Sequence, residues 1–249
     1  MSKPGRPPRL DRDKAIDRAM LLFWERGYEG TTLEALLEAM GGIKPPSFYN
    51  AFGSKEELFR VVTEQYACTI GKAGGDALEA ATSVRQGIAE MLRLSADAFT
   101  MPGYPQGCLL LSAGAHCAPS SSGAAAHMTA LRHELPVSIR ARLRRAVAEG
   151  DLDPSADIPL IAAYYTTVLY GLAQRASDGE SRQTLRRVAK LAMDAWPGLA
   201  RPVGDGRLPG GLERAAVAGL GRAGGRLVGG RLARGRLARG RLARGRLVR

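Results

Sequence analysis

The chain has 249 residues, of which 45% are hydrophobic, and its formal net charge at pH 7 is +12. This length allows one or two domains with substantial hydrophobic cores. The positive charge lies almost entirely in the last part of the chain, because residues 201–249 hold 13 Arg against only Asp205 and Glu213. Net charge therefore does not identify the rest of the chain as a nucleic-acid-binding protein.

The cysteine content and the hydropathy exclude two other classes of protein. Three cysteines are too few for a disulfide-stabilised secreted domain and fit a reducing compartment. No purely apolar run approaches the roughly 18 residues of a membrane span, and the first residues lack the apolar segment of a signal peptide. We therefore expect a cytoplasmic protein with no part in the membrane.

The first residues form a basic arm in which Pro4, Pro7 and Pro8 favour an extended conformation. Such an arm ahead of a DNA-binding domain can lie along phosphates or enter the minor groove. It can equally remain a solvated terminus. The sequence leaves both interpretations open.

Residues 13–26 are expected to form the first helix, because apolar residues recur on one face and Gly27 can end it. Thr31 and Glu34 then fit a capping box, in which a hydroxyl accepts from a backbone N–H and a carboxylate reaches back to the cap. A second helix is therefore expected to begin near Thr32. Its apolar pattern stops at a glycine pair, which can adopt the positive φ of a sharp turn.

The next segment, residues 44–52, has prolines in a first helical turn and an aromatic face behind them. Ser54 and Glu57 fit another capping box, which predicts that a further helix begins at Lys55. The order of helix, glycine turn, helix and capped helix is that of a helix-turn-helix.

At these residues the chain resembles the TetR family of bacterial transcriptional repressors. The resemblance covers about residues 9–66 and rests on GIKPPSFYNAF at residues 42–52 and KEEL at residues 55–58. The chain departs from the commoner family pattern at Lys44, where a small capping hydroxyl is usual, and at the two prolines that follow.

The resemblance implies an all-α protein with a helix-turn-helix domain at residues 9–69 and a helical effector-binding and dimerisation domain at residues 70–200. It implies a sequence-specific regulator that binds double-stranded operator DNA, most often a repressor released by a small-molecule or electrophile/oxidant effector. In the family the second helix of the motif enters the major groove. The side chains expected to contact DNA are Thr32, Lys44, Pro45, Ser47, Tyr49, Asn50 and Lys55.

These side chains suit different parts of DNA. Lys44 can reach a phosphate or a guanine edge, and Asn50 can meet a phosphate or a base. Ser47, Tyr49 and Lys55 suit phosphates, which set the register of a protein on DNA. Tyr49 could equally serve packing, and Lys55 could equally only solvate its helix.

Residues 64–196 are rich in Ala and Leu and show no strand-like alternation, which predicts an all-α domain. Clusters of glycine and proline, among them Gly74-Gly75, predict its breaks. The expected helices lie at residues 55–72, 83–99, 107–117, 124–133, 136–149, 157–176 and 181–196.

The helices at 157–176 and 181–196 each carry a broad apolar face. The resemblance implies that they form a homodimer as a four-helix bundle, which would present two recognition helices to paired half-sites. The alternative is that both faces pack only inside one subunit.

The resemblance also implies an effector pocket in this domain. A cysteine in the first turn of an apolar helix predicts a lowered thiol pKa and a reactive sensor at Cys108, although free cysteines are also often buried and structural. Cys117 lies about 13 Å further along such a helix, too far for a disulfide bond. The residues favoured as pocket wall or sensor, each of which could instead fill the core, are Cys108, Phe99, Tyr104, His116 and Tyr165, with Met101, Met128 and Tyr164 as further wall residues.

Residues 231–249 repeat Arg-Leu-Ala-Arg-Gly with a period of five, which fits neither a helix nor a strand. Residues 201–249 are therefore expected to form a disordered, low-complexity tail. Its charge would attract nucleic acid or anionic membranes non-specifically, or the tail has no role. A non-specific nucleic-acid-binding protein that acts through this tail is the alternative function.

Catalysis is not expected. His127 and His133 lack the i, i+3 or i+4 spacing of a helical metal pair, and no histidine has a partnered Ser or Asp arrangement. No Gly-rich phosphate loop occurs either. The sequence therefore predicts no catalytic residue, no cofactor and no metal site.

Overall fold

The structure, a computed structural model, describes residues 11–113 and 117–200. Every regular element in that part of the chain is a helix, which confirms the all-α prediction. None of the helices described there has the length and apolar character needed to cross a membrane. The N-terminal arm, His116 and the Arg/Gly tail lie outside the described residues.

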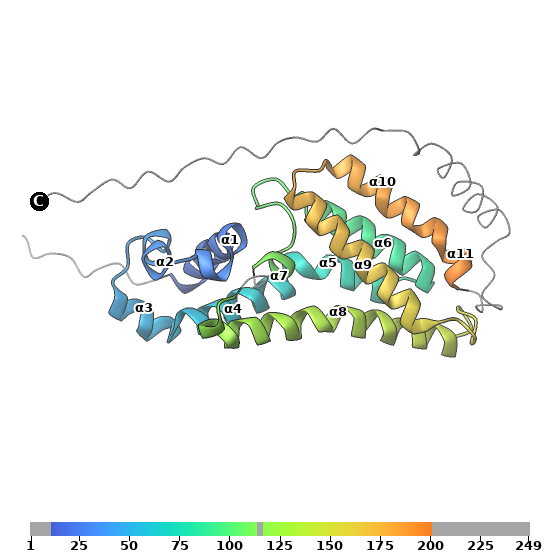
Figure 1. The fold of residues 1–249 in the computed structure, drawn as a ribbon, viewed down its shortest axis with the longest axis horizontal. Coiled ribbons are helices and arrows are strands. Elements are labelled where there is room, and N and C mark those ends of the chain that lie inside the picture. The colour runs from blue at the N-terminus through green and yellow to red at the C-terminus, as the bar shows by residue number, and fades with distance from the viewer. Residues whose placement is uncertain (1–10, 114–116, 201–249) are drawn as a thin grey trace, which may run out of the picture. The chain divides into compact units, whose positions relative to one another are not determined.

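The helices fall into a compact N-terminal group and a longer remainder (Figure 1). The N-terminal group comprises α1 (Arg12–Gly30), α2 (Leu33–Ala39), α3 (Pro45–Phe52) and α4 (Lys55–Cys68). The remainder comprises α5 (Ala73–Ala80), α6 (Val84–Ala98), α7 (Leu109–Ser112), α8 (Ser122–Ala148), α9 (Ile158–Ser177), α10 (Arg182–Ala192) and α11 (Trp196–Leu199), with short 3-10 turns at Ile70–Lys72, Pro119–Ser121 and Met193–Ala195. Helix α4 lies beside α8, and α6 packs against α5, α9 and α10 (Figure 1).

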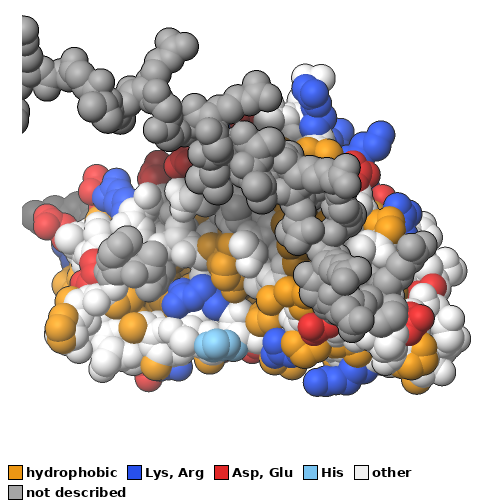
Figure 2. Space-filling view, turned by 45° about the vertical axis from the view of Figure 1, so that its right-hand side comes forward, with side chains coloured by type: hydrophobic (Ala, Val, Ile, Leu, Met, Phe, Trp, Pro, Cys, Tyr) orange, Lys and Arg blue, Asp and Glu red, His pale blue; other side chains and the backbone are white. Residues whose placement is uncertain are grey.

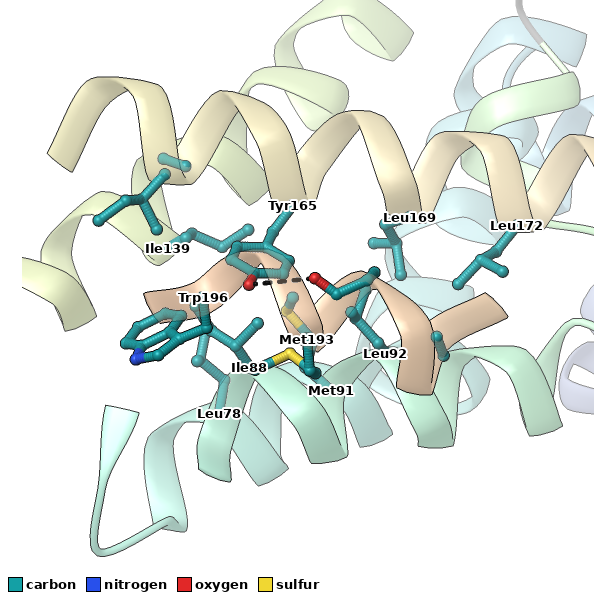
Figure 3. Packing of buried hydrophobic residues seen from close by; sticks show 14 of the residues in the cluster. Leu78, Ile88, Met91, Leu92, Ile139, Tyr165, Leu169, Leu172, Met193 and Trp196 are labelled. Atoms are coloured by element: carbon teal, nitrogen blue, oxygen red, sulfur yellow. Dashed lines mark hydrogen bonds between the residues drawn. The ribbon is translucent and has the colours of Figure 1, made fainter. Parts of the chain in front are cut away.

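Two groups of buried hydrophobic residues form the core. One joins α1 to α4 with α7 and the start of α8, and it includes Leu109 and Met128. The other fills the space between α5, α6, α9, α10 and the second half of α8. Figure 3 shows part of this second group, where Tyr165 and Trp196 meet the apolar side chains of α6. The packing of α7 and α8 against the N-terminal helices joins the two parts of the molecule.

The glycine turn that ends the first helical run is present, since Gly27 has φ 70° and ψ 176° within α1. The predicted cap of the second helix is wrong by one residue. Thr32 precedes α2, and its hydroxyl accepts from the Ala35 N–H at 3.1 Å. Thr31 is fully buried, and its hydroxyl donates to the Gly27 carbonyl at 2.7 Å. Each of the two adjacent threonines has a hydroxyl that could cap the helix. Because Thr31 is buried, Thr32 serves as the cap.

The predicted break at Gly74-Gly75 is also wrong, because α5 runs through both glycines. Gly74 faces α6 so closely that a Cβ built on it would lie 2.6 Å from Ser95 Oγ and 3.2 Å from the carbonyl oxygen of Met91. The missing side chain therefore allows two helices to approach each other.

Helix α8 continues through Pro136, where the sequence predicted two separate helices. Proline has no N–H to donate to the carbonyl of Arg132, four residues earlier. The hydroxyl of Tyr170 in α9 donates to that carbonyl at 3.1 Å. A neighbouring helix thus supplies the missing partner, which explains how α8 tolerates its proline.

Replacing Tyr170 by Phe is therefore expected to lower the free energy of unfolding by roughly 1–3 kcal/mol, because the Arg132 carbonyl then lacks a hydrogen-bond partner. Urea unfolding followed by circular dichroism would measure the change. Tyr104→Phe is the matched control, since Tyr104 is 38% exposed. Equal stability of the Tyr170→Phe variant and the unmodified protein would contradict this explanation.

Candidate nucleic-acid interface and ligand cavity

Gly41 and Gly42 form the turn between α2 and α3, with φ values of 92° and 72°. Residues with a side chain rarely adopt such values. Arg18 of α1 donates to the Ala39 carbonyl at 3.3 Å and so holds the end of α2. The turn and this hydrogen bond set the direction in which α3 leaves α2.

Two aromatic side chains attach α3 to the N-terminal core. Phe48 and Phe52 are 0% and 5% exposed, and their ring centroids lie 5.6 Å apart. The guanidinium of Arg12 lies 5.4 Å from the centroid of the Phe52 ring, within the range of a cation–π contact. One side of α3 is therefore fixed against its neighbours.

The other side of α3 is exposed. Tyr49 is 50% exposed, and Ser47 and Asn50, three residues apart, share a face of the helix. The structure thus brings together, as exposed residues on or just before one short helix, Lys44, Pro45, Ser47, Tyr49 and Asn50.

Lys44 occupies the cap position of α3 without a side-chain cap hydrogen bond. Helix N-termini have unpaired N–H groups, but Pro45 and Pro46 have none to cap. The Ser47 N–H is bonded to the Lys44 carbonyl at 2.9 Å. The Lys44 ammonium, which can only donate hydrogen bonds, takes no part in the cap, and the side chain is exposed.

The two other residues predicted to contact DNA lie at the starts of neighbouring helices. The Thr32 hydroxyl is used as the cap of α2. Lys55 begins α4, and its Nζ lies 4.2 Å from the ring centroid of Tyr28. Partial burial lowers the pKa of Lys55. This contact ties the start of α4 to the end of α1, next to α3.

A cavity of about 290 Å³ lies between α4, α5, α6, α7, α8 and α9. This volume is near the lower end of the roughly 300–1,000 Å³ typical of ligand pockets. Among the described residues, no group of three or more His, Cys, Asp or Glu side chains is placed to hold a metal ion. The polar or ionisable side chains that line the cavity are Tyr66, Ser95, Cys108, Arg132, Glu134, Ser138 and Tyr170.

Two of the predicted pocket residues, Phe99 and Cys108, line this cavity. Tyr104 does not, because its ring packs against Trp24 with centroids 5.9 Å apart. His116 lies outside the described residues.

Tyr165 also lies away from the cavity. It is fully buried in the second core group, where its ring centroid lies 6.0 Å from that of Trp196. Its hydroxyl donates to the Ala192 carbonyl at 3.5 Å (Figure 3). Met128 belongs to the first core group, and Tyr164 lines a groove between α9 and α10. The residues of α9 that line the cavity are Leu169 and Tyr170, one turn or more after Tyr165.

The predicted lowering of the Cys108 pKa is wrong. The predicted helix at residues 107–117 is reduced among the described residues to the four residues of α7, and Cys108 precedes it as the cap. Burial raises the pKa of Cys108 and outweighs the hydrogen bonds from the Tyr66 hydroxyl and from the N–H groups of Leu111 and Leu110, which favour the thiolate. The Tyr66 hydroxyl donates to Sγ at 3.6 Å.

Iodoacetamide is therefore expected to label Cys108 more slowly than the exposed Cys68 at pH 7, because only the thiolate reacts. Because burial raises the pKa of Cys108, its labelling rate should continue to increase with pH beyond the range over which an unperturbed thiol titrates. Peptide mass spectrometry after limiting alkylation measures both rates, and labelling in urea gives the unfolded reference. Faster labelling of Cys108 than of Cys68 at pH 7 would contradict a partly buried, protonated thiol at Cys108.

Comparisons with known proteins agree with the helix-turn-helix geometry. The family model described as "Bacterial regulatory proteins, tetR family" matches residues 15–62. The chain is 32% identical to the HTH-type transcriptional repressor ComR of Escherichia coli over 199 residues, which cover 79% of this chain and 94% of ComR. It is 28% identical to the repressor BdcR of the same species over 192 residues, 77% of this chain and 92% of BdcR.

A solved structure is similar over the same part of the chain. It is a cysteine mutant of the TetR family transcriptional regulator CifR, complexed with 26-bp double-strand operator DNA. CifR is 44% identical in sequence to this chain, and the two structures superpose with a TM-score of 0.74. The match covers 77% of this chain and 100% of the CifR chain. The proteins named here are regulators of transcription, and the similarity to ComR extends far beyond the helix-turn-helix. The chain belongs to the TetR family of bacterial regulatory proteins.

Proposed function

We propose that this protein is a homodimeric repressor that binds operator DNA through α3 and releases it when a small molecule occupies the cavity. The observation that carries the proposal is the exposed side of α3, held in place by the buried Phe48 and Phe52. The CifR structure with operator DNA supports the same role for this chain. The site of action would be the bacterial chromosome in the cytoplasm.

On DNA, α3 would lie in the major groove, which admits an α-helix. Ser47 and Tyr49 would donate to phosphates and set the register, while Lys44 and Asn50 would reach base edges or further phosphates. Thr32 and Lys55 flank this surface at the starts of α2 and α4. A helix of eight residues reads few base pairs, so specific binding requires a second copy.

The second copy would pack on α9 and α10. A groove of about 380 Å³ between them is lined mainly by apolar side chains, with Val188 and Leu191 44% and 67% exposed. On the face seen in Figure 2, hydrophobic side chains gather in patches among Lys and Arg side chains. Exposed apolar surface of this kind is typical of protein interfaces. Two copies of α9 and α10 would form a four-helix bundle at this groove.

Tyr66 offers the route by which the cavity affects α3. Its ring packs edge-on against Trp24 of α1 with centroids 4.9 Å apart, and its hydroxyl contacts Cys108 in the cavity wall. A ligand in the cavity would displace Tyr66 and therefore shift α4 against α1. The ligand would favour the state in which the two copies of α3 no longer match their half-sites.

A reversible ligand fits this site better than an electrophile or an oxidant. The cavity is mostly apolar, and the raised pKa of Cys108 keeps its thiol protonated near neutral pH. A covalent effector would have to react with that protonated thiol, which is a poor nucleophile. Covalent sensing by Cys108 remains the second candidate, and the labelling experiment above separates the two.

The test is a fluorescence-anisotropy titration of the full chain on DNA that flanks its own gene. We expect saturable binding that survives an excess of unrelated DNA. Binding lost to unrelated DNA would instead favour the non-specific alternative. Deleting residues 203–249 and repeating the titration at two salt concentrations then measures the contribution of the tail, because each phosphate contact adds to the salt dependence.

A further inference from the structure

The cavity contains an arginine whose hydrogen-bonding capacity is only partly used. Arg132 of α8 lines the cavity, and its Nη2 donates to Thr129 Oγ1 at 3.1 Å. Its Nη1 is buried and has no hydrogen-bond partner in the described part of the chain. A buried charged donor without a partner is costly, so the site favours an acceptor that arrives from outside.

Within residues 11–113 and 117–200, no acidic side chain forms an ion pair with this guanidinium. The acidic residue that lines the same cavity, Glu134, is exposed and forms no ion pair with Arg132 in the structure described. Arg132 also borders a second cavity of about 290 Å³ together with Cys108, Leu111 and Tyr170. The Arg132 side chain therefore lines two cavities whose other lining side chains are mainly uncharged.

The backbone that carries this arginine is held in place. The Tyr170 hydroxyl donates to the Arg132 carbonyl that Pro136 leaves unpaired. Tyr170 itself lines both cavities. This hydrogen bond holds the backbone of Arg132 in place, and with it the position from which the Arg132 side chain extends. A group fixed before binding loses less conformational entropy when the ligand arrives.

We propose that the ligand of this cavity is a small monocarboxylic acid with an apolar body, whose carboxylate pairs with Arg132. A guanidinium matches a carboxylate with two parallel hydrogen bonds. One cation favours a single negative charge, and the walls at Phe99, Leu110 and Leu169 favour an apolar body. The inference rests on the proposed function in taking this cavity as the effector site.

Isothermal titration calorimetry on the full chain without DNA tests the proposal with phenylacetate and hexanoate and with their neutral amides. We expect each acid to bind more tightly than its amide by about tenfold or more, the effect of a charged hydrogen bond. Arg132→Gln should remove this preference, and Arg132→Lys should retain part of it. Arg144→Gln is the matched control, since Arg144 is exposed on the same helix and does not line the cavity.

Equal binding of acid and amide would overturn the proposal, as would an acid preference that persists in Arg132→Gln. Absence of heat with both acids at millimolar concentration would do so too. Circular dichroism of each variant shows whether it is folded, and Arg132→Lys tests the charge even if Arg132→Gln does not fold. Operator binding without acid preference would contradict this inference alone, whereas acid binding without operator binding would contradict the proposed function alone.

Discussion

Replacing Leu191 by Asp is expected to convert the proposed dimer into monomers and to weaken operator binding by roughly 100-fold or more, because the linked second half-site is lost. Leu191 lines the groove between α9 and α10 and is 67% exposed. In a dimer the substituted residue would place a carboxylate in an apolar interface, where an unpaired charge is strongly unfavourable.

Analytical ultracentrifugation of the variant gives the oligomeric state, and fluorescence anisotropy gives its operator affinity. Val137→Asp is the matched control, since Val137 is 53% exposed on α8 and does not line that groove. A Leu191→Asp protein that stays dimeric would show that α9 and α10 pack only within one subunit.

Substitutions of two adjacent residues of α3 are expected to affect different properties, stability for Phe48 and operator binding for Tyr49. Phe48 is 0% exposed, so Phe48→Ala should lower the free energy of unfolding by roughly 3–5 kcal/mol. Tyr49 is 50% exposed, so Tyr49→Phe should leave the unfolding free energy within about 0.5 kcal/mol of the unmodified protein. The same Tyr49→Phe change should weaken operator binding by about 1.5–3 kcal/mol, through loss of a hydrogen bond to a charged phosphate.

Urea unfolding of both variants and operator titrations of Tyr49→Phe measure these three quantities. Because Tyr49→Phe keeps the ring that packs edge-on against Phe48 at 5.5 Å, a lower affinity would report the hydroxyl alone. If Tyr49→Phe bound the operator as well as the unmodified protein, Tyr49 would serve packing and not phosphate contact.

The helix-turn-helix was largely predictable because its signals are local. Caps, glycine turns and prolines in a first turn act within a few residues, so the start of α4 after Ser54 was predicted correctly. The one-residue error at Thr31 and Thr32 has a tertiary cause. Both residues carry a hydroxyl that could cap the helix. The burial of Thr31, whose hydroxyl donates to the Gly27 carbonyl, leaves Thr32 as the cap.

The larger part of the chain was less predictable because its decisive contacts join distant segments. From the sequence alone, Gly74 predicts a helix break. In the structure it lies within a helix, where the absence of a side chain allows the Met91 carbonyl to approach closely. Pro136 also predicts a helix break. The helix continues because the Tyr170 hydroxyl donates to the carbonyl that the proline leaves unpaired.

The cavity shows the same limit. Phe99 and Cys108 were predicted as wall residues, but Tyr66, Arg132 and Tyr170 were not. The Tyr170 hydroxyl donates to the Arg132 carbonyl that Pro136 leaves without a partner, and this contact between two helices is not evident from the sequence. The Cys108 pKa was predicted in the wrong direction for a related reason, since burial depends on helices far away in the sequence.

Hydroxyl-radical footprinting of the full chain on the DNA that flanks its gene tests the central claim most directly. A dimer that inserts two copies of α3 into successive major grooves should protect two segments whose centres lie about 10–10.5 base pairs, or a multiple of that, apart. Protection should disappear with Leu191→Asp and should be weaker with Tyr49→Phe. Uniform protection along the fragment, or two protected segments that persist in both variants, would contradict a dimer that reads its operator through α3.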